Sequence, residues 1–287
     1  MQLTARPVLQ ARASLGEGPL WDCQKSVLHW LDINNNLVHT FNPESGNDTF
    51  IDVGEMPGCI VPRRSGGFIL GLPEKFAALD GDKVSPIAHM EQGLGNRMND
   101  GKCDPAGRFW CGSMHPKFNE GAANLWMMDK NLNVEKKLSS VTISNGLAWS
   151  ADKKTMYYID TKTNKVDAFD FDIASGDIAN RRPVIKNTWG GYFDGMTIDT
   201  EDNLYVAIWD GGCVLKINPQ SGELLAKIMV PGVKNVTCPT FGGIDMNELF
   251  ITSSAEGADA DEQPNAGALF HIALKDAQGI AAFQFDG

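Results

Sequence analysis

Short apolar stretches that follow a charged or polar turn recur six times along the chain. They are rich in aromatic and β-branched residues and are bounded by Gly, Asp, Asn or Pro, which is typical of β-strands. Successive stretches are separated by 40 to 48 residues, a period typical of propeller blades and other repeat arrays. They begin at Val27 (VLHW), Gly67 (GFIL), Arg108 (RFWC), Thr155 (TMYY), Asn203 (NLYV) and Glu248 (ELFI).

Further strands accompany these stretches in most repeats. A third strand runs into a turn with Asn or Asp at its start and Gly at the position of positive φ, as in LVHTFNPESG, VDAFDFDIASG and VLKINPQSG. Segments such as DTFIDV and RRPVIKN supply a fourth strand, and no long window shows a helical stripe. We therefore predict an all-β fold in which residues 1–287 form one six-bladed β-propeller of four-stranded blades.

The first residues and the last repeat bear on how the ring closes. We expect the segment LTARPVLQAR to add an outer strand to the last blade, which would protect the edges of the sheets. Residues 254–267 (SAEGADADEQPNAG) are predicted to be a polar loop between two strands of that blade. The alternative architecture is a pair of packed antiparallel domains with three repeats each, but no linker or change of composition divides the chain.

Composition narrows the possible partners and the compartment. The net charge of −11 argues against nucleic acid, because binding phosphates requires a basic surface. No apolar run approaches the length of a membrane span, and the start has no apolar signal core. The six cysteines have no C-x-x-C spacing, so we expect reduced thiols and a cytoplasmic protein. We expect a monomer or a weak homo-oligomer.

Oxygen-bearing side chains occur at one phase of the repeat, each directly before a glycine. Glu17, Asn145 and Asp194 share this phase, and Asp100 occupies it in the third repeat. Taken singly, Asn-Gly and Asp-Gly are common hairpin turns. If the repeats circle one axis, however, these side chains meet at one end of it, and two carboxylates beside an amide would repel one another without a cation. All-oxygen ligation suits a hard divalent ion, so we predict a central metal site.

The third repeat places a different set of side chains at the same corner. In LGNRMNDGKCDPAGRFW, Arg97 and Asn99 offer donors for hydroxyl or carbonyl oxygens, and Asp100 offers an acceptor. A salt-bridged, solvated loop that also includes Lys102 is the structural alternative. Beside a predicted metal site, the concentration of hydrogen-bonding groups favours recognition of a polyol.

Several long motifs in the same order are similar to those of the SMP-30/gluconolactonase/luciferin-regenerating enzyme family. The resemblance covers nearly the whole chain, and it implies a six-bladed propeller with one divalent cation in the central channel and a lactonase activity, typically on sugar lactones. The motifs that carry it are SLGEGPLW (14–21), RMNDGKCDPAGRFWCGSM (97–114), ISNGLAWSADKKTMYYIDT (143–161) and DGMTIDTEDNLYVAIWDGG (194–212).

The resemblance also implies roles for individual residues. The metal-binding Glu, Asn and Asp of the family fall on Glu17, Asn145 and Asp194, which the repeat phase selects independently. The substrate-binding Arg and Asn fall on Arg97 and Asn99, with Asp100 beside them. A further substrate-binding Glu of the family has no secure equivalent, because the loop HPKFNEGAANLW is short. Glu120 lies within one or two positions of it, and His115 in this loop is expected to face the entrance.

We predict metal-assisted hydrolysis of a sugar lactone, gluconolactone-like or a pentonolactone, to the aldonic acid. The cation is expected to be Ca²⁺, with Zn²⁺, Mn²⁺, Mg²⁺ or Fe²⁺ as alternatives. Asp194 would be the catalytic residue, either accepting the proton of the attacking water or only orienting the nucleophile. Two other functions stay open: another lactone, ester or phosphotriester hydrolase, and a non-catalytic calcium-binding regulatory protein. A calcium buffer would have no use for the Arg97, Asn99 and Asp100 cluster.

Overall fold

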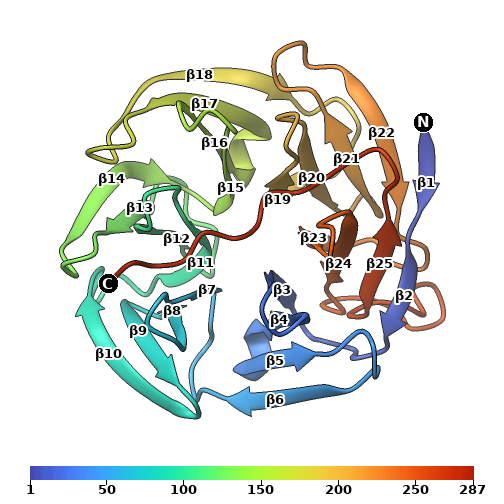
Figure 1. The fold of residues 1–287 in the computed structure, drawn as a ribbon, viewed down its shortest axis with the longest axis horizontal. Helices are drawn as coiled ribbons and strands as arrows, with labels where there is room; N and C mark the ends of the chain where they lie inside the picture. The colour runs from blue at the N-terminus through green and yellow to red at the C-terminus, as the bar shows by residue number, and fades with distance from the viewer.

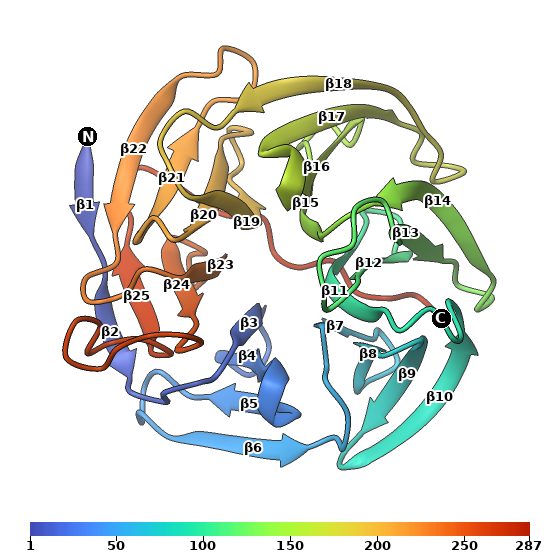
Figure 2. The same cartoon turned by 180° about the vertical axis from the view of Figure 1, so that it is seen from behind.

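The computed structural model describes residues 1–287 as six sheets arranged in a ring around one axis (Figure 1). Within each blade the first strand lies beside the axis and the fourth lies at the rim, and neighbouring strands of the four are antiparallel (Figures 1 and 2). The prediction of an all-β, six-bladed propeller of four-stranded blades is therefore confirmed.

The blades follow one another in sequence order. Blades 1 to 3 consist of β3 (Gly16–Asp22), β4 (Val27–Asp32), β5 (Leu37–Phe41) and β6 (Asp48–Asp52); β7 (Cys59–Pro62), β8 (Phe68–Leu72), β9 (Lys75–Asp80) and β10 (Lys83–His89); and β11 (Arg97–Cys103), β12 (Phe109–Met114), β13 (Ala123–Met128) and β14 (Val134–Val141). Blades 4 to 6 consist of β15 (Ser144–Trp149), β16 (Thr155–Asp160), β17 (Lys165–Phe171) and β18 (Ile178–Lys186); β19 (Tyr192–Ile198), β20 (Leu204–Trp209), β21 (Cys213–Ile217) and β22 (Leu224–Met229); and β23 (Val236–Gly242), β24 (Glu248–Ser253) and β25 (Leu269–Ala273), to which the N-terminal segment adds β2 (Arg6–Leu9).

The N-terminal segment closes the ring. β2 pairs antiparallel with β25, so the sixth blade is built from both ends of the chain, as the sequence predicts. An additional strand, β1 (Gln2–Thr4), pairs in parallel with β22 and extends blade 5 to five strands. The sequence does not predict β1.

The C-terminal tail, residues 274–287, crosses one face of the propeller (Figure 1, red). It forms isolated bridges from Gly279 to Asp199 in blade 5 and from Phe285 to Arg63 in blade 2. Phe285 is fully buried in the core between blades 2 and 3, and its backbone N–H donates to the carbonyl of Pro62 at 2.8 Å. The tail therefore covers the end of the central channel on this face.

Aromatic side chains fill the space between blades. Trp110, Trp149 and Phe171 are buried and meet edge to face, with ring centroids 6.0 to 6.3 Å apart, between blades 3 and 4. Edge-to-face pairs at such separations stabilise a core by more than the burial of their apolar area alone would.

The two helical segments, η1 (Ile33–Asn35) and η2 (Thr161–Thr163), are single 3₁₀ turns. None of the helices has the length and the apolar character of a membrane-spanning segment.

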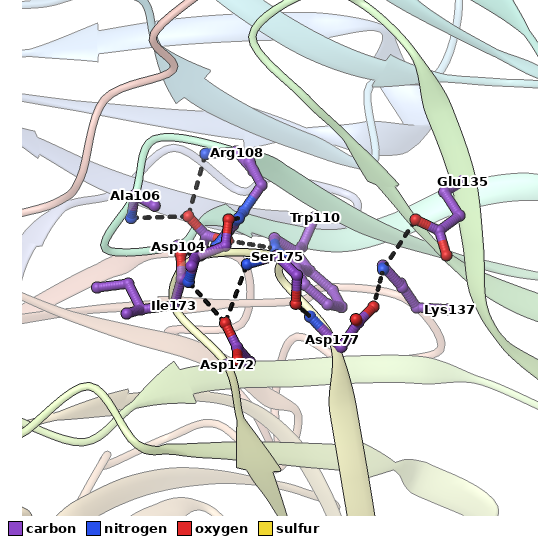
Figure 3. A network of polar contacts seen from close by, with 11 residues as sticks. Asp104, Ala106, Arg108, Trp110, Glu135, Lys137, Asp172, Ile173, Ser175 and Asp177 are labelled. Atoms are coloured by element: carbon purple, nitrogen blue, oxygen red, sulfur yellow. Dashed lines mark hydrogen bonds and ion pairs between the residues drawn. The ribbon is translucent and has the colours of Figure 1, made fainter.

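A buried polar network ties the β11–β12 turn of blade 3 to the β17–β18 turn of blade 4 (Figure 3). The fully buried carboxylate of Asp104 accepts hydrogen bonds from the N–H of Ala106 at 2.8 Å, the Trp110 indole at 2.9 Å and Nε of Arg108 at 2.6 Å. The guanidinium of Arg108 also donates a hydrogen bond to the carbonyl of Ile173 in the β17–β18 turn at 2.8 Å. Because a buried charge needs partners, this network fixes the turn that follows β11.

Candidate functional site

The predicted metal ligands lie on the innermost strands of three blades. Glu17 is on β3, Asn145 on β15 and Asp194 on β19, and Asp100 occupies the corresponding part of β11. All four side chains are buried. They are strand residues within the sheets, so the interpretation of these Glu-Gly, Asn-Gly and Asp-Gly pairs as hairpin turns is wrong.

A β-bulge occurs at this position in each of these four strands. The pairing register shifts between Glu17 and Leu20, between Met98 and Gly101, between Asn145 and Leu147, and between Phe193 and Met196. Such bulges bend a strand locally and change the direction of its side chains, and they are frequent at functional sites. The repeated bulge is the structural basis of the repeated polar residue.

The glycine after each polar residue allows the inner strands to approach one another. A Cβ atom at Gly146 would lie 2.9 Å from the backbone oxygen of Asp194, and one at Gly195 would lie 2.9 Å from the backbone oxygen of Thr237. Both distances are too short for a real side chain. The motif therefore combines a polar group with the close packing of neighbouring blades.

The orientation of the Asn145 amide is determined by its hydrogen bonds. The hydroxyl of Thr161, in η2, donates to the carbonyl of Phe193 at 2.9 Å, so its oxygen must accept at its other contact. That contact is Nδ2 of Asn145 at 2.9 Å. Oδ1 of Asn145 is buried and has no hydrogen-bond partner, so it is left available as a ligand atom.

Each carboxyl group of the site disfavours ionisation of the others. Burial, followed by the charge of Asp100, raises the pKa of Glu17 to about 8. Burial and the charges of Glu17 and Asp100 raise the pKa of Asp194 well above its ordinary value. The pKa of Asp100 is raised by burial and is lowered in part by the ammonium of Lys102. Ionised carboxylates in this channel thus require a positive charge beside them.

The donor set fits a divalent cation. Besides Oδ1 of Asn145, Oδ2 of Asp100 is buried without a partner, and an unpaired buried oxygen is costly unless it binds a ligand. The fold gathers no group of three or more His, Cys, Asp or Glu side chains suited to a metal, so the candidate set is two carboxylates, of Glu17 and Asp194, with one amide. Oxygen donors of this kind suit a hard cation that keeps other positions open.

The third repeat supplies the only guanidinium of the site. One terminal nitrogen of Arg97 donates to Oδ1 of Asn99 at 2.7 Å and to the carbonyl of Met98 at 3.0 Å. Nδ2 of Asn99 donates to the carbonyl of Ser144 at 2.7 Å, across the gap to blade 4. Asn99 therefore holds Arg97 in place, and the remaining N–H groups of Arg97 have no hydrogen-bond partner in the protein.

Glu120, the remaining predicted substrate-binding residue, lies in the loop after β12. Glu120 is exposed, and no hydrogen bond or ion pair joins it to Arg97, Asn99 or Asp100. Nδ1 of His115 accepts a hydrogen bond from the backbone N–H of Lys117 at 3.1 Å, within the same loop. The structure thus brings together the other six predicted residues, which are Glu17, Arg97, Asn99, Asp100, Asn145 and Asp194.

Three residues that support the site were not found by sequence reasoning. Thr161 orients Asn145, and Glu256 in the last loop contributes negative charge near Arg97. Glu91 is buried and accepts hydrogen bonds from Asn96 at 3.0 Å and from the Trp126 indole at 2.8 Å. None of the three occupies the position before a glycine that recurs in the repeats, so the repeat pattern does not identify them.

A cavity of about 90 Å³ lies in the channel between the polar cluster and the C-terminal tail. Its walls are mainly apolar, with Ile60 and Leu147 among them, and Ile280 and Phe283 of the tail form its floor. Lys102 also lines it and donates to the carbonyl of Met196. The tail thereby separates the polar cluster from solvent at this end of the channel.

Comparison with known proteins gives consistent matches. Residues 15–255 match the family model described as SMP-30/Gluconolactonase/LRE-like region. Regucalcin of Danio rerio is 36% identical over 288 residues, which cover 98% of this chain and 97% of that protein. Among solved structures, a luciferin-regenerating enzyme aligns with a TM-score of 0.93 at 30% identity over 99% of both chains. A calcium-binding protein, regucalcin, from Agrobacterium tumefaciens aligns with a TM-score of 0.93 at 26% identity over 99% of this chain and 98% of that one.

Proposed function

Because the chain belongs to the SMP-30/gluconolactonase/LRE-like family, we propose that it is a divalent-cation-dependent lactonase that opens a sugar aldonolactone to the aldonic acid. One observation carries the proposal most strongly. Oδ1 of Asn145 is buried without a partner in the channel that also holds the carboxyl groups of Glu17 and Asp194. The adjacent Arg97, with free N–H groups, gives the same channel a means of binding hydroxyl oxygens.

Glu17, Asn145 and Asp194 would hold the cation, with Ca²⁺ as the first candidate and Mg²⁺, Mn²⁺, Zn²⁺ and Fe²⁺ as alternatives. When bound, it would supply Lewis-acid polarisation of the lactone carbonyl. The protein itself supplies the remaining functions. Arg97, held by Asn99, binds hydroxyl oxygens of the sugar and fixes the lactone relative to the carboxylates.

Asp194 is the proposed proton acceptor. Water adds to the carbonyl carbon while its proton passes to the Asp194 carboxylate, and the bond from that carbon to the ring oxygen then breaks. The same proton passes to the departing ring oxygen, which becomes the hydroxyl of the aldonic acid. A bound cation would offset the burial and the charges of Glu17 and Asp100 that raise the pKa of Asp194, so the carboxylate would be ionised and able to accept this proton.

Removal of divalent cations tests the proposal directly. Protein stripped with a chelator is expected to lose lactonase activity, and addition of single cations should restore it to different degrees. Acid release from a panel of aldonolactones measures the activity, with correction for spontaneous ring opening. Full activity in protein that elemental analysis shows to be free of metal would contradict the proposal.

The raised pKa of Glu17 predicts a pH dependence of cation binding. In the cation-free fold Glu17 keeps its proton up to about pH 8, whereas in the unfolded chain it loses it near 4.5. Stability of the cation-free protein therefore falls as pH rises through this window. A cation must displace the same proton, so the increase in Tm on adding Ca²⁺ should grow from about pH 5 to about pH 8.

Calorimetry with and without Ca²⁺ across this window measures the effect, and the Glu17→Gln variant is its control. The variant carries no titrating group at this position. The increase in Tm on adding Ca²⁺ should therefore be smaller in the variant and should vary less with pH. A Ca²⁺-dependent increase in Tm that is constant over the window in the unaltered protein would show that Glu17 does not exchange its proton for the cation.

A non-catalytic calcium-binding role is the second candidate. Similarity to a protein described as a calcium-binding regucalcin favours it. Binding of Ca²⁺ at Glu17, Asn145 and Asp194, combined with no turnover of any lactone in the panel, would support this role and exclude the proposed one.

A further inference from the structure

A groove of about 410 Å³ opens beside Arg97, over blades 2 and 3. Its walls come from the segments around Glu55, Lys75 and His89 of blade 2 and from the loop that leads into β11. Its volume lies within the range of about 300–1,000 Å³ that is usual for small-molecule sites. Because Arg97 lines this groove and also lies near Glu17 and Asp194, the groove adjoins the proposed active site.

The groove is held in a fixed shape by buried hydrogen bonds. The carboxylate of Glu91 accepts hydrogen bonds from Asn96 at 3.0 Å and from Ser113 at 3.0 Å, which anchors the loop before Arg97 to β12. On the blade 2 side, Glu74 accepts a hydrogen bond from the backbone N–H of Gly93 at 2.8 Å. A preformed wall reduces the entropy that a ligand would lose on binding.

The chemistry of the lining indicates what the groove can bind. Only one of its eleven lining residues is hydrophobic, and most of the others have side chains that can form hydrogen bonds. Lys75 is paired with Glu55 at 2.5 Å, and the carboxylate of Glu74 offsets the charge of Arg97, so these side chains provide no excess of positive charge for a phosphate group. The groups that remain available are the guanidinium of Arg97 and the imidazole and amide groups of the lining.

Several of these groups are free to bind a ligand. Arg97 has N–H groups without a protein partner, and the side chains of His89 and Gln92 are exposed in the groove wall and form no hydrogen bond within the protein. Oδ1 of Asn96, also in the lining, is buried and has no hydrogen-bond partner. Such a set of donors and acceptors matches the hydroxyl groups of an uncharged sugar.

We propose that this groove, lined by Arg97, Asn96, Gln92 and His89, binds a second sugar unit attached to the lactone. The preferred substrate class is then an aldobionolactone, in which a glycosyl group is carried on a hydroxyl of the aldonolactone. This inference rests on the proposed lactonase function and specifies its substrate. The lactone ring would occupy the channel, and the glycosyl unit would lie in the groove on the other side of Arg97.

The test compares δ-gluconolactone with two aldobionolactones that differ in which hydroxyl carries the second sugar. The unaltered protein, loaded with cation, is expected to show a kcat/KM at least about tenfold higher for one of the two, which two neutral hydrogen bonds would supply. In Gln92→Trp, the indole fills the groove. This variant should lose that advantage and keep its kcat/KM for δ-gluconolactone within about twofold, since Gln92 is outside the channel.

Gln24→Trp is the matched control, because Gln24 is exposed in the β3–β4 turn and does not line the groove. It should keep the preference for the aldobionolactone. Turnover of δ-gluconolactone with no preference for either larger lactone, or equal losses on all substrates in Gln92→Trp, would overturn the groove proposal and leave the lactonase function intact. Failure to hydrolyse any of the three lactones would overturn both.

Discussion

Replacing Asp194 with Asn is expected to lower kcat by at least ~100-fold, the scale expected when general-base or electrophilic assistance is lost. The substitution keeps the size of the side chain and one oxygen ligand, but removes the negative charge and the proton acceptor. Folding should be preserved, because the stability of the propeller is distributed over six hydrophobic clusters that lie between neighbouring blades. Steady-state kinetics at saturating cation, combined with metal analysis and thermal unfolding, measures the effect.

The control is Asp82→Asn, which removes the same charge from an exposed turn between β9 and β10. Its kcat should equal that of the unaltered protein. If Asp194→Asn binds the cation and turns over lactone at the normal rate, Asp194 is only a residue of the bulge in β19, and the proposed proton transfer is wrong.

Replacing Arg97 with Ala is expected to lower kcat/KM for polyhydroxylated lactones by about 10- to 150-fold, mainly through KM, because a hydrogen bond from a charged donor is lost. A lactone of the same ring size without hydroxyl groups should scarcely be affected. The remaining N–H groups of Arg97 have no partner in the protein, so their loss should affect the ligand more than the fold. Side-by-side kinetics on the two lactones, with metal content checked, gives the comparison.

Arg97→Lys provides a second measurement. It retains the positive charge next to Glu17 and Asp194 but loses the planar pair of donors. An intermediate loss, again confined to hydroxylated lactones, is expected. Equal losses on both lactones in Arg97→Ala would instead assign Arg97 a structural or purely electrostatic role.

Much of the fold was predictable because each blade repeats the same strand pattern. β4, β16 and β24 begin at the predicted residues, Val27, Thr155 and Glu248, and the other three second strands begin one residue later than predicted. The parallel pairing of β1 with β22 was not predictable, since QLT is too short to show a period. The path of the C-terminal tail also has no local signal, because it depends on the distant residues that bury Phe285.

The site was predictable to the extent that it follows the repeat. The common phase identified Glu17, Asn145 and Asp194, and the structure shows that bulges and close strand packing account for that phase. Thr161 escaped detection because its contact with Asn145 depends on the conformation of η2. Glu120 was placed by proximity in a loop, and loop conformation determines whether such a side chain reaches the channel.

The pairing of β2 with β25 has a consequence for synthesis of the chain on the ribosome. Residues 6–9 are synthesised long before their partners, residues 269–273. During this interval the nascent protein is an open arc with unpaired strand edges, and such edges readily pair with other chains. We therefore expect the interval before residues 269–273 are synthesised, rather than formation of the individual blades, to be the stage at which this protein most depends on molecular chaperones.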